Sequence, residues 1–263
     1  MERKIKMKIE VLMSTMFFER EKSDYLENMN LETDMIIGNQ TDSISEEMFV
    51  HKKHKVKILS RSDRGVGLNR NVSLFSSDAD VVVFADNDVV YKKGYSKIIE
   101  DYYKKNKKAD VVIFNFKERR GEESFKDINV KNGKASFRDL SKFGTYAITA
   151  RRMSLLRNRL SFSLLFGGGA MYSHGEDTIF LYDCYRKGLN IYLSSETIGE
   201  VTHRESTWYH GVTEKSIVDQ GVLYKTLFPK WYKLAILCHL FRHYDMYRNM
   251  GSFSHIYTIM NEA

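Results

Sequence analysis

A five-residue apolar run, Val81 to Ala85, is followed at once by two aspartates, Asp86 and Asp88, and this feature constrains the fold most. An uninterrupted apolar run bounded by charged residues predicts a fully buried strand. In open α/β sheets, ligands bind at the carboxyl ends of the strands. Paired carboxylates at that edge suit a hard divalent cation, and such cations usually lie beneath phosphates. The segment is therefore either a metal- and phosphate-binding edge of an α/β sheet or a charged loop after a strand.

Bulk composition narrows the class of protein. The 263 residues suffice for one large domain or a domain with an appendage. Two cysteines, Cys184 and Cys238, provide neither a disulfide framework nor a metal-binding spacing, which favours a reducing setting. The N-terminal residues lack a signal-peptide core, and no apolar stretch approaches the roughly 20 residues that span a bilayer. We expect a cytoplasmic protein, soluble or peripheral at the inner membrane face.

The net charge of +7 bears on the partners of the protein. A basic balance is compatible with phosphorylated substrates, an anionic membrane or nucleic acid. The densest basic runs, 52–55 and 104–108, fall where solvated turns are expected, and no nucleic-acid-binding motif accompanies them. We therefore expect no nucleic-acid partner.

Strand and helix patterns alternate over the first 115 residues or so. Apolar runs and alternations predict strands at 8–14, 34–39, 56–59, 81–85 and 110–116. Helical patterns begin near residues 24 and 94 and after residue 65, where Leu68, Val72 and Phe75 share one helix face. A capping box, Ser43 to Glu46, predicts one more short helix. Strands separated by helices indicate an α/β fold with a mostly parallel sheet flanked by helices.

The second half of the chain is less regular. Residues 117–149 are polar and weakly periodic, which predicts a hairpin or an irregular excursion. Further helices are expected at 151–160 and 177–187, a strand and loop at 190–202, and two terminal helices at 213–228 and 231–244. The segment Phe166 to Ala170, with three glycines, predicts a flexible loop that can bring backbone close to a ligand.

Glu176 and Asp177 open the helix that follows the glycine loop. A carboxylate at a helix start is held by free backbone N–H groups and by the positive end of the helix dipole. Asp177 would then be fixed and ionised, as a general base must be, or it would be a plain N-cap aspartate. His203, which follows an extended stretch, is either a surface histidine or a ligand for a borderline divalent ion such as Mn²⁺.

The order of these motifs resembles that of the GT-A glycosyltransferases, family 2 in particular. The matching segments are Ser14-Thr15, Asn39-Gln40, Gly65 to Asn71, Asp86-Asn-Asp88, Glu176-Asp177 and His203, and they cover roughly residues 8–205. The resemblance implies a GT-A (Rossmann-like) catalytic domain at 1–205 and a helical extension at 206–263. Within the domain, about 1–115 would bind the nucleotide-sugar and about 116–205 the acceptor. The implied reaction is transfer from a UDP-sugar, with Mn²⁺ or Mg²⁺ and with inversion at the anomeric carbon.

The resemblance also implies roles for single residues. Asp86 would lie near the ribose and diphosphate and contribute to the metal site, Asp88 would bind the metal, and His203 would add a ligand. Asp177, with its neighbour Glu176, would supply the catalytic base. The residues that fall where family members line the uridine pocket are Thr15, Asn39, Asp42, Asp63 and Arg70.

Two departures from the family pattern concern specificity. Met16-Phe17-Phe18 replaces the usual aromatic–Asn pair after the first strand, which leaves base recognition open. The usual Arg-x-x-Arg-Trp element after the Glu-Asp pair is missing, which leaves the acceptor class open. The acceptor would be a glycan, lipid-linked or protein-borne.

Two alternatives remain at this stage. Val82 to Val90 also resembles the nucleophile motif of haloacid-dehalogenase-type phosphatases and phosphotransferases, in which the first aspartate, here Asp86, attacks phosphorus. That strand normally opens its fold, whereas three strand–helix units precede it here. The chain could also be a non-catalytic module that binds a nucleotide-sugar or a glycan. Metal-dependent hydrolysis of a sugar nucleotide, or transfer of its sugar, would distinguish a glycosyltransferase from both alternatives.

The segment Trp231 to Tyr244 mixes apolar, basic and aromatic residues. This composition is typical of helices on a membrane surface. It suits equally a helix packed on the catalytic domain or a contact in a homodimer. A peripheral membrane contact and a homodimer are therefore both expectations for this segment.

Overall fold

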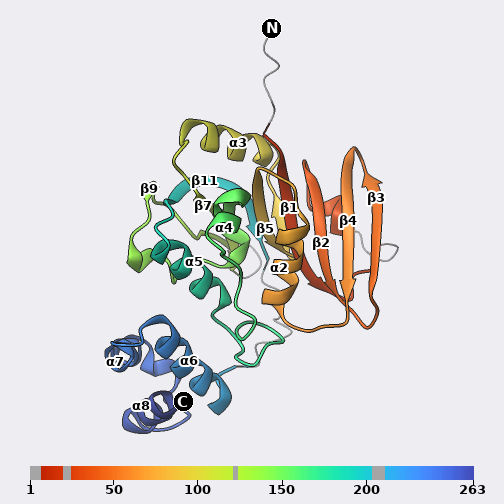
Figure 1. Ribbon diagram of the computed structural model, residues 1–263. Coiled ribbons are helices and arrows are strands. Elements are labelled where there is room, and N and C mark those ends of the chain that lie inside the picture. Colours follow the sequence, from red (N-terminus) through yellow and green to blue (C-terminus); the bar gives the residue numbers. More distant parts are fainter. Residues whose placement is uncertain (1–6, 20–24, 121–123, 203–210) are drawn as a thin grey trace.

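A computed structural model describes residues 7–19, 25–120, 124–202 and 211–263 (Figure 1). Within these residues, eleven strands form one sheet. The order across the sheet is β3 (Ser45–His51), β4 (His54–Arg61), β2 (Asp34–Gln40), β1 (Ile9–Met16), β5 (Val81–Asp86), β10 (Ile148–Arg151), β7 (Val111–Arg120), β11 (Ile191–Val201) and β6 (Val89–Tyr91), while β8 (Ser124–Asp127) pairs with β7 and β9 (Gly133–Lys134) with β11.

The sheet is parallel on both sides of one central antiparallel strand. Strands β4, β2, β1 and β5 run parallel to one another, and so do β7 and β11. Between these groups, β10 pairs antiparallel with both β5 and β7. The residues of β5 from Val81 to Ala85 are buried, as their apolar run predicted. The expected α/β fold with a mostly parallel sheet is confirmed.

Helices pack on this sheet and fix the loops at its carboxyl edge. The helix α2 (Val66–Ser76) contacts β1 and β2, α3 (Tyr95–Lys105) contacts β11, and α4 (Arg152–Arg157) contacts β10. The helix α5 (Glu176–Arg186) follows the glycine loop, and the short α1 (Tyr25–Asn28) follows β1. The aromatic rings of Phe84 on β5, Phe162 and Phe180 on α5 pack together, with ring centroids 4.2 to 5.8 Å apart.

The predicted helix at Ser43–Glu46 is wrong. Residues Ser45–His51 form the edge strand β3, which pairs antiparallel with β4 along its whole length. Lys52 turns the chain back toward β4 with a positive φ of 56°. Pairing with β4 satisfies the backbone groups that the capping box would have satisfied locally, so the tertiary contact decides the structure.

The helix after residue 65 is confirmed, but its buried face is not the apolar one. Phe75 is exposed, whereas Asn69, Arg70 and Asn71 are buried. Asn69 Nδ2 donates to the Gly38 carbonyl at 2.7 Å, and Asn71 Nδ2 donates to the Phe162 carbonyl at 2.9 Å. The helix therefore presents a polar face to the sheet edge, where it joins distant backbone segments.

The C-terminal residues form a separate helical unit, α6 (Glu214–Leu227), α7 (Tyr232–His243) and α8 (Phe253–Glu262) (Figure 1). The two expected helices correspond to α6 and α7, and α8 was not expected. The unit has a small core of its own, formed by Ile217, Ile236, Leu240, Tyr247, Ile256 and Met260. The expected boundary at residues 205–206 lies outside the described residues. No helix in the described ranges is both long enough and apolar enough to cross a bilayer.

Candidate active site

The carboxyl ends of β1 and β5 meet at one edge of the sheet. The parallel register pairs Ser14 with Asp86, so the residues after each strand lie together. Asn87 Nδ2 donates to Thr15 Oγ1 at 3.2 Å across this edge. The residues expected to bind the nucleotide-sugar and the metal thus begin to converge where α/β folds bind ligands.

Arg70 joins the two acidic motifs. Its side chain, 5% exposed, donates to Asp86 Oδ1 at 2.8 Å and to Glu176 Oε1 at 2.7 Å. Burial opposes the charge of the guanidinium, but the two carboxylates outweigh it and raise the pKa of Arg70 above its ordinary value. A buried arginine held by two carboxylates fixes the relative positions of β5, α2 and α5.

The glycine loop brings its backbone against these helices. Gly168 accepts a hydrogen bond from the Val66 amide of α2 at 2.9 Å. A Cβ at Gly167, where φ is +106°, would lie 2.6 Å from Val66 Cγ1 and 2.9 Å from Glu176 Cδ. Only glycine fits at this position, because both the conformation and the space exclude a side chain.

Asp177 is the second residue of α5, and the N-cap is Gly175, so Asp177 is not an N-cap aspartate. Its Oδ1 accepts a hydrogen bond from the Thr178 amide at 2.6 Å. Burial, and after it the neighbouring charge of Glu176, raise the pKa of Asp177 to about 7. The expectation of a permanently ionised carboxylate needs correction, since near neutral pH Asp177 can both lose and accept a proton.

One cleft of about 1370 Å³ connects these groups. The expected site residues that line it are Thr15, Arg70, Asp86, Asp88, Glu176 and Asp177. The opposite wall comes from the C-terminal helices and includes Tyr224, His239, His243 and Tyr247. Sequence reasoning missed this wall, because the aromatic and histidine spacing on α6 and α7 carries no signal beyond that of a helix.

Three further expected residues within the described ranges, Asn39, Asp42 and Asp63, do not line this cleft. Asn39 is buried beneath it, where its amide accepts from the Phe18 N–H at 2.8 Å and donates to the Phe18 carbonyl at 3.2 Å. Asp42 pairs with Arg64 at 2.6 Å and Asp63 with Arg61 at 2.8 Å. Gln40, next to Asn39, does line the cleft and accepts from the Gly65 amide at 2.8 Å.

The donor set limits the kind of metal site that could form here. Asp86 and Asp88 present carboxylates to the cleft, and one Asp86 oxygen already accepts from Arg70. Among the described residues, no group of three or more histidine, cysteine or acidic side chains could hold a metal. His203 lies outside those residues. The pair fits a cation of the Mg²⁺ type, which one or two carboxylates bind together with the phosphates of a ligand.

The fold is that of solved structures of TarS from S. aureus. No family model matches the chain, and no curated protein matches it in sequence. TarS residues 1–349 in complex with UDP-GlcNAc match with a TM-score of 0.62 and 17% identity, over 84% of this chain and 66% of that one. The complex with UDP matches with a TM-score of 0.57 and 16% identity, over 84% of this chain and 65% of that one. A further TarS structure matches with a TM-score of 0.60 and 16% identity, over 92% of this chain and 54% of that one.

These matches show the fold, and it is the expected GT-A fold. The chain spans less than two thirds of the length of the TarS chains it matches. Among the described residues, four strands precede β5, and no comparison supports the haloacid-dehalogenase-type alternative for Asp86.

Proposed function

We propose that the protein transfers a sugar from a UDP-sugar to a hydroxyl group of a glycan. The observation that carries this proposal is that Asp86 and Asp88, at a strand end, and Asp177, at a helix start, line the same cleft. The resemblance of the motifs and the fold shared with a protein solved with UDP-GlcNAc support the same donor.

The donor would bind at the sheet edge. Thr15 and Gln40 line the cleft beside the ends of β1 and β2 and offer polar groups to a nucleoside. The diphosphate would lie near Asp86 and Asp88, and these two carboxylates would hold Mn²⁺ or Mg²⁺. Such an ion, when bound, offsets the negative charge of the leaving diphosphate as a Lewis acid.

Asp177 would act as the general base. The acceptor oxygen forms a new bond to the anomeric carbon, and its proton passes to the Asp177 carboxylate. The bond from that carbon to the diphosphate oxygen breaks, and UDP leaves with the electron pair. A pKa of about 7 suits this role, because a base works best when its pKa is near the working pH. One displacement of this kind inverts the anomeric configuration, so a UDP-α-sugar would give a β-linkage.

The acceptor would enter along the wall formed by the C-terminal helices. His239 Nε2 lies 2.7 Å from the Tyr247 hydroxyl, and the ring centroids of His239 and His243 are 4.9 Å apart. Burial, and after it the nearby His243, lower the pKa of His239 to about 4, so its ring is neutral at pH 7. Uncharged rings and hydroxyls suit a sugar, which has both apolar faces and hydroxyl groups. A lipid-linked or protein-borne glycan would present such a sugar.

The helix α7 would contact an anionic membrane surface. Trp231, Leu234 and Phe241 lie along one side of it, and Trp231 and Phe241 are 69% and 78% exposed. The exposed Lys233 and Arg242 flank this side, so apolar and basic groups face outward together. Each basic residue near anionic lipid contributes about 1 kcal/mol, an effect that salt weakens. Flotation with anionic liposomes at low salt tests this contact, and a salt-resistant dimer without flotation would assign the surface to a second copy.

The function is tested by a donor screen. Purified protein is incubated with a panel of nucleotide-sugars and Mn²⁺, and release of the nucleoside diphosphate is measured with and without a chelator. We expect release from a UDP-sugar that stops when the metal is removed. Binding of UDP-sugars without hydrolysis or transfer to any glycan acceptor would instead favour a non-catalytic binding module.

A further inference from the structure

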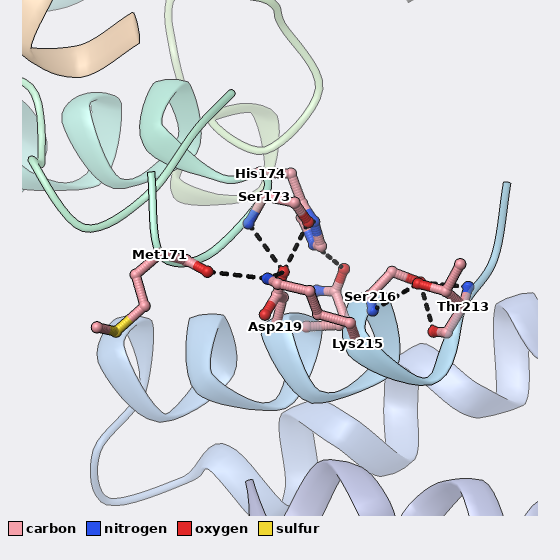
Figure 2. Close-up of polar contacts among 8 residues, drawn as sticks. Met171, Ser173, His174, Thr213, Lys215, Ser216 and Asp219 are labelled. Atoms are coloured by element: carbon pink, nitrogen blue, oxygen red, sulfur yellow. Dashed lines mark hydrogen bonds and ion pairs between the residues drawn. The ribbon is translucent and has the colours of Figure 1, made fainter. Parts of the chain in front are cut away.

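The segment before the catalytic helix contacts α6 of the C-terminal unit. Asp219 Oδ2 accepts hydrogen bonds from the Ser173 amide at 2.8 Å and from the Ser173 hydroxyl at 2.7 Å (Figure 2). Lys215, one turn earlier on α6, donates to the same oxygen at 2.7 Å and to the Met171 carbonyl at 2.8 Å. Lys215 and Asp219, which are one turn apart on α6, thus hold the loop at Met171 and at Ser173.

The contact continues to Gly175, the N-cap residue of α5. His174 Nε2 lies 3.0 Å from Gln220 Oε1, and its Nδ1 lies 3.1 Å from Ser173 Oγ. Gly175, the N-cap of α5, has a φ of +103°, and a Cβ there would lie 2.7 Å from Leu223 Cδ1. Side chains of α6 therefore pack directly against the residue that precedes Glu176 and Asp177.

Asp219 is a buried charge whose Oδ2 accepts three hydrogen bonds. It is 2% exposed, and a buried carboxylate is unfavourable unless it is paired and hydrogen-bonded. Burial alone would raise the pKa of Asp219, but the hydrogen bonds from Lys215 and Ser173 outweigh it and keep the pKa below its ordinary value. Asp219 is thus ionised at the pH at which Asp177 would exchange a proton.

The first turn of α5 is consequently held from two sides. Arg70 holds Glu176 from the sheet edge, and α6 holds the segment from Met171 to Gly175 from the opposite side. Asp177 follows these contacted residues directly in the chain. If α6 released the loop, only Arg70 would hold the start of α5, and the Asp177 carboxyl would be less firmly placed.

We propose that Asp219 is a positioning residue for Asp177: it fixes the loop that leads into α5 and so holds the base in place. This inference rests on the proposed function, because it assumes that Asp177 is the base. It makes the C-terminal helices part of the catalytic apparatus through a contact that does not involve the donor.

The test compares two substitutions at Asp219 with a control elsewhere in the helical unit. Asp219→Ala removes the acceptor for Ser173 and Lys215, whereas Asp219→Asn keeps one oxygen that can accept the Ser173 amide. Met260→Ala removes a buried side chain on α8 and weakens the same unit from its far side. Turnover, the donor KM, the pH profile of kcat and UDP binding are measured for each folded variant.

We expect Asp219→Ala to lower kcat by roughly ten- to a hundredfold, because small misplacements of a catalytic group have effects of this size. The donor KM and UDP binding should not change. The acidic limb of the pH profile should move to lower pH, because the charge of Glu176 contributes to the raised pKa of Asp177 and a displaced Asp177 loses part of that effect. Asp219→Asn should restore part of kcat, and Met260→Ala should lower only the melting temperature. Unchanged kcat and pH profile in Asp219→Ala, or equal losses in Met260→Ala, would overturn the proposal.

Amide hydrogen exchange separates this proposal from the proposed function. If the wild-type protein transfers sugar from no UDP-sugar, the proposed function fails, and the role of Asp177 fails with it. The contact itself is still tested by the exchange of the amides of residues 171–178. These should exchange faster in Asp219→Ala than in Met260→Ala, and equal protection in both would overturn the positioning role independently of activity.

Discussion

The two walls of the cleft differ in how charge is used. At the sheet edge, the buried Arg70 holds Asp86 and Glu176, so acidic groups are fixed by a charged partner. On the helical wall, the rings of Tyr224, His239 and Tyr247 pack in a cluster with no ion pair among them. This difference fits the proposal that the phosphates and the metal bind at the charged wall and that a neutral sugar acceptor binds at the aromatic wall. Substitutions on the two walls should therefore change different kinetic parameters.

Replacing Asp177 with Asn should give the largest effect, a loss of about 10²- to 10⁴-fold in turnover, which is the usual contribution of a positioned base. Donor binding should remain, because the amide keeps the size of the side chain and the charged wall is intact. Steady-state kinetics and calorimetric UDP binding measure both quantities. Near-normal turnover would show that the base lies elsewhere.

Replacing Asp88 with Ala should weaken UDP binding in the presence of Mn²⁺ by roughly a hundredfold, since one of two carboxylate ligands is lost. The fold should be unchanged, because the residue follows the buried strand β5 and does not belong to the apolar core. Calorimetry with and without Mn²⁺ tests this, and the matching control is Asp78→Ala, an exposed aspartate before the same strand. Equal binding by wild type and Asp88→Ala would remove Asp88 from the metal site.

Replacing Arg70 with Met should destabilise the protein by about 3 kcal/mol, because two partly buried carboxylates lose their shared, buried partner. Arg64→Met is the control, since Arg64 pairs with the exposed Asp42 and such pairs contribute about 1 kcal/mol or less. Denaturant unfolding of both variants gives the comparison. Equal losses would mean that the Arg70 bridge contributes no more than a surface ion pair.

At pH values below 7, turnover should decrease about tenfold for each unit by which the pH is lowered. Above pH 7, turnover should be constant. The sign follows from the raised pKa of Asp177: the protonated form accumulates as the pH falls through about 7, and only the deprotonated form can accept the acceptor proton. A pH profile of kcat under saturating donor and acceptor checks this. An acidic limb centred near pH 4 would mean that Asp177 is more hydrated than its burial indicates.

The smallest effect should come from the helical wall. His243 is exposed and lines the cleft, so His243→Ala should leave the fold intact and raise the acceptor KM by a few-fold, the value of one stacking contact. The donor KM should not change. A rise in the donor KM instead would show that the two walls do not divide donor from acceptor.

The sequence predicted most elements whose signal is local. The buried strand β5 and the position of α5 both follow from short patterns, and the structure contains both. The edge strand β3 was missed because its backbone partner, β4, outweighs a local capping signal. The helix α8 was missed although Ser252 caps it and its apolar residues Phe253, Ile256 and Met260 have helical spacing, because ten residues give only a short stretch of periodicity.

The carboxylates of the candidate site could be predicted from the sequence, but the side chains that hold them in place could not. Asp86, Asp88 and Asp177 carry signals of their own at a strand end and a helix start. The bridging role of Arg70 depends on partners 16 and 106 residues away, and the Asp219 contact on a partner 46 residues away. Contacts at such separations are set by the packing of whole elements, and no periodicity in one sequence reveals them.

The central position of β10 has a consequence for the order of synthesis. Strands β3, β4, β2, β1 and β5 are complete once residue 86 has been made, but the next strand across the sheet is β10, at residues 148–151. Until then, the apolar Val81–Ala85 strand would be the open edge of a half-formed sheet on the ribosome, and open apolar edges pair with other chains. A chain that stops before residue 148 should therefore aggregate, and slow folding should be traced to the closing of this edge.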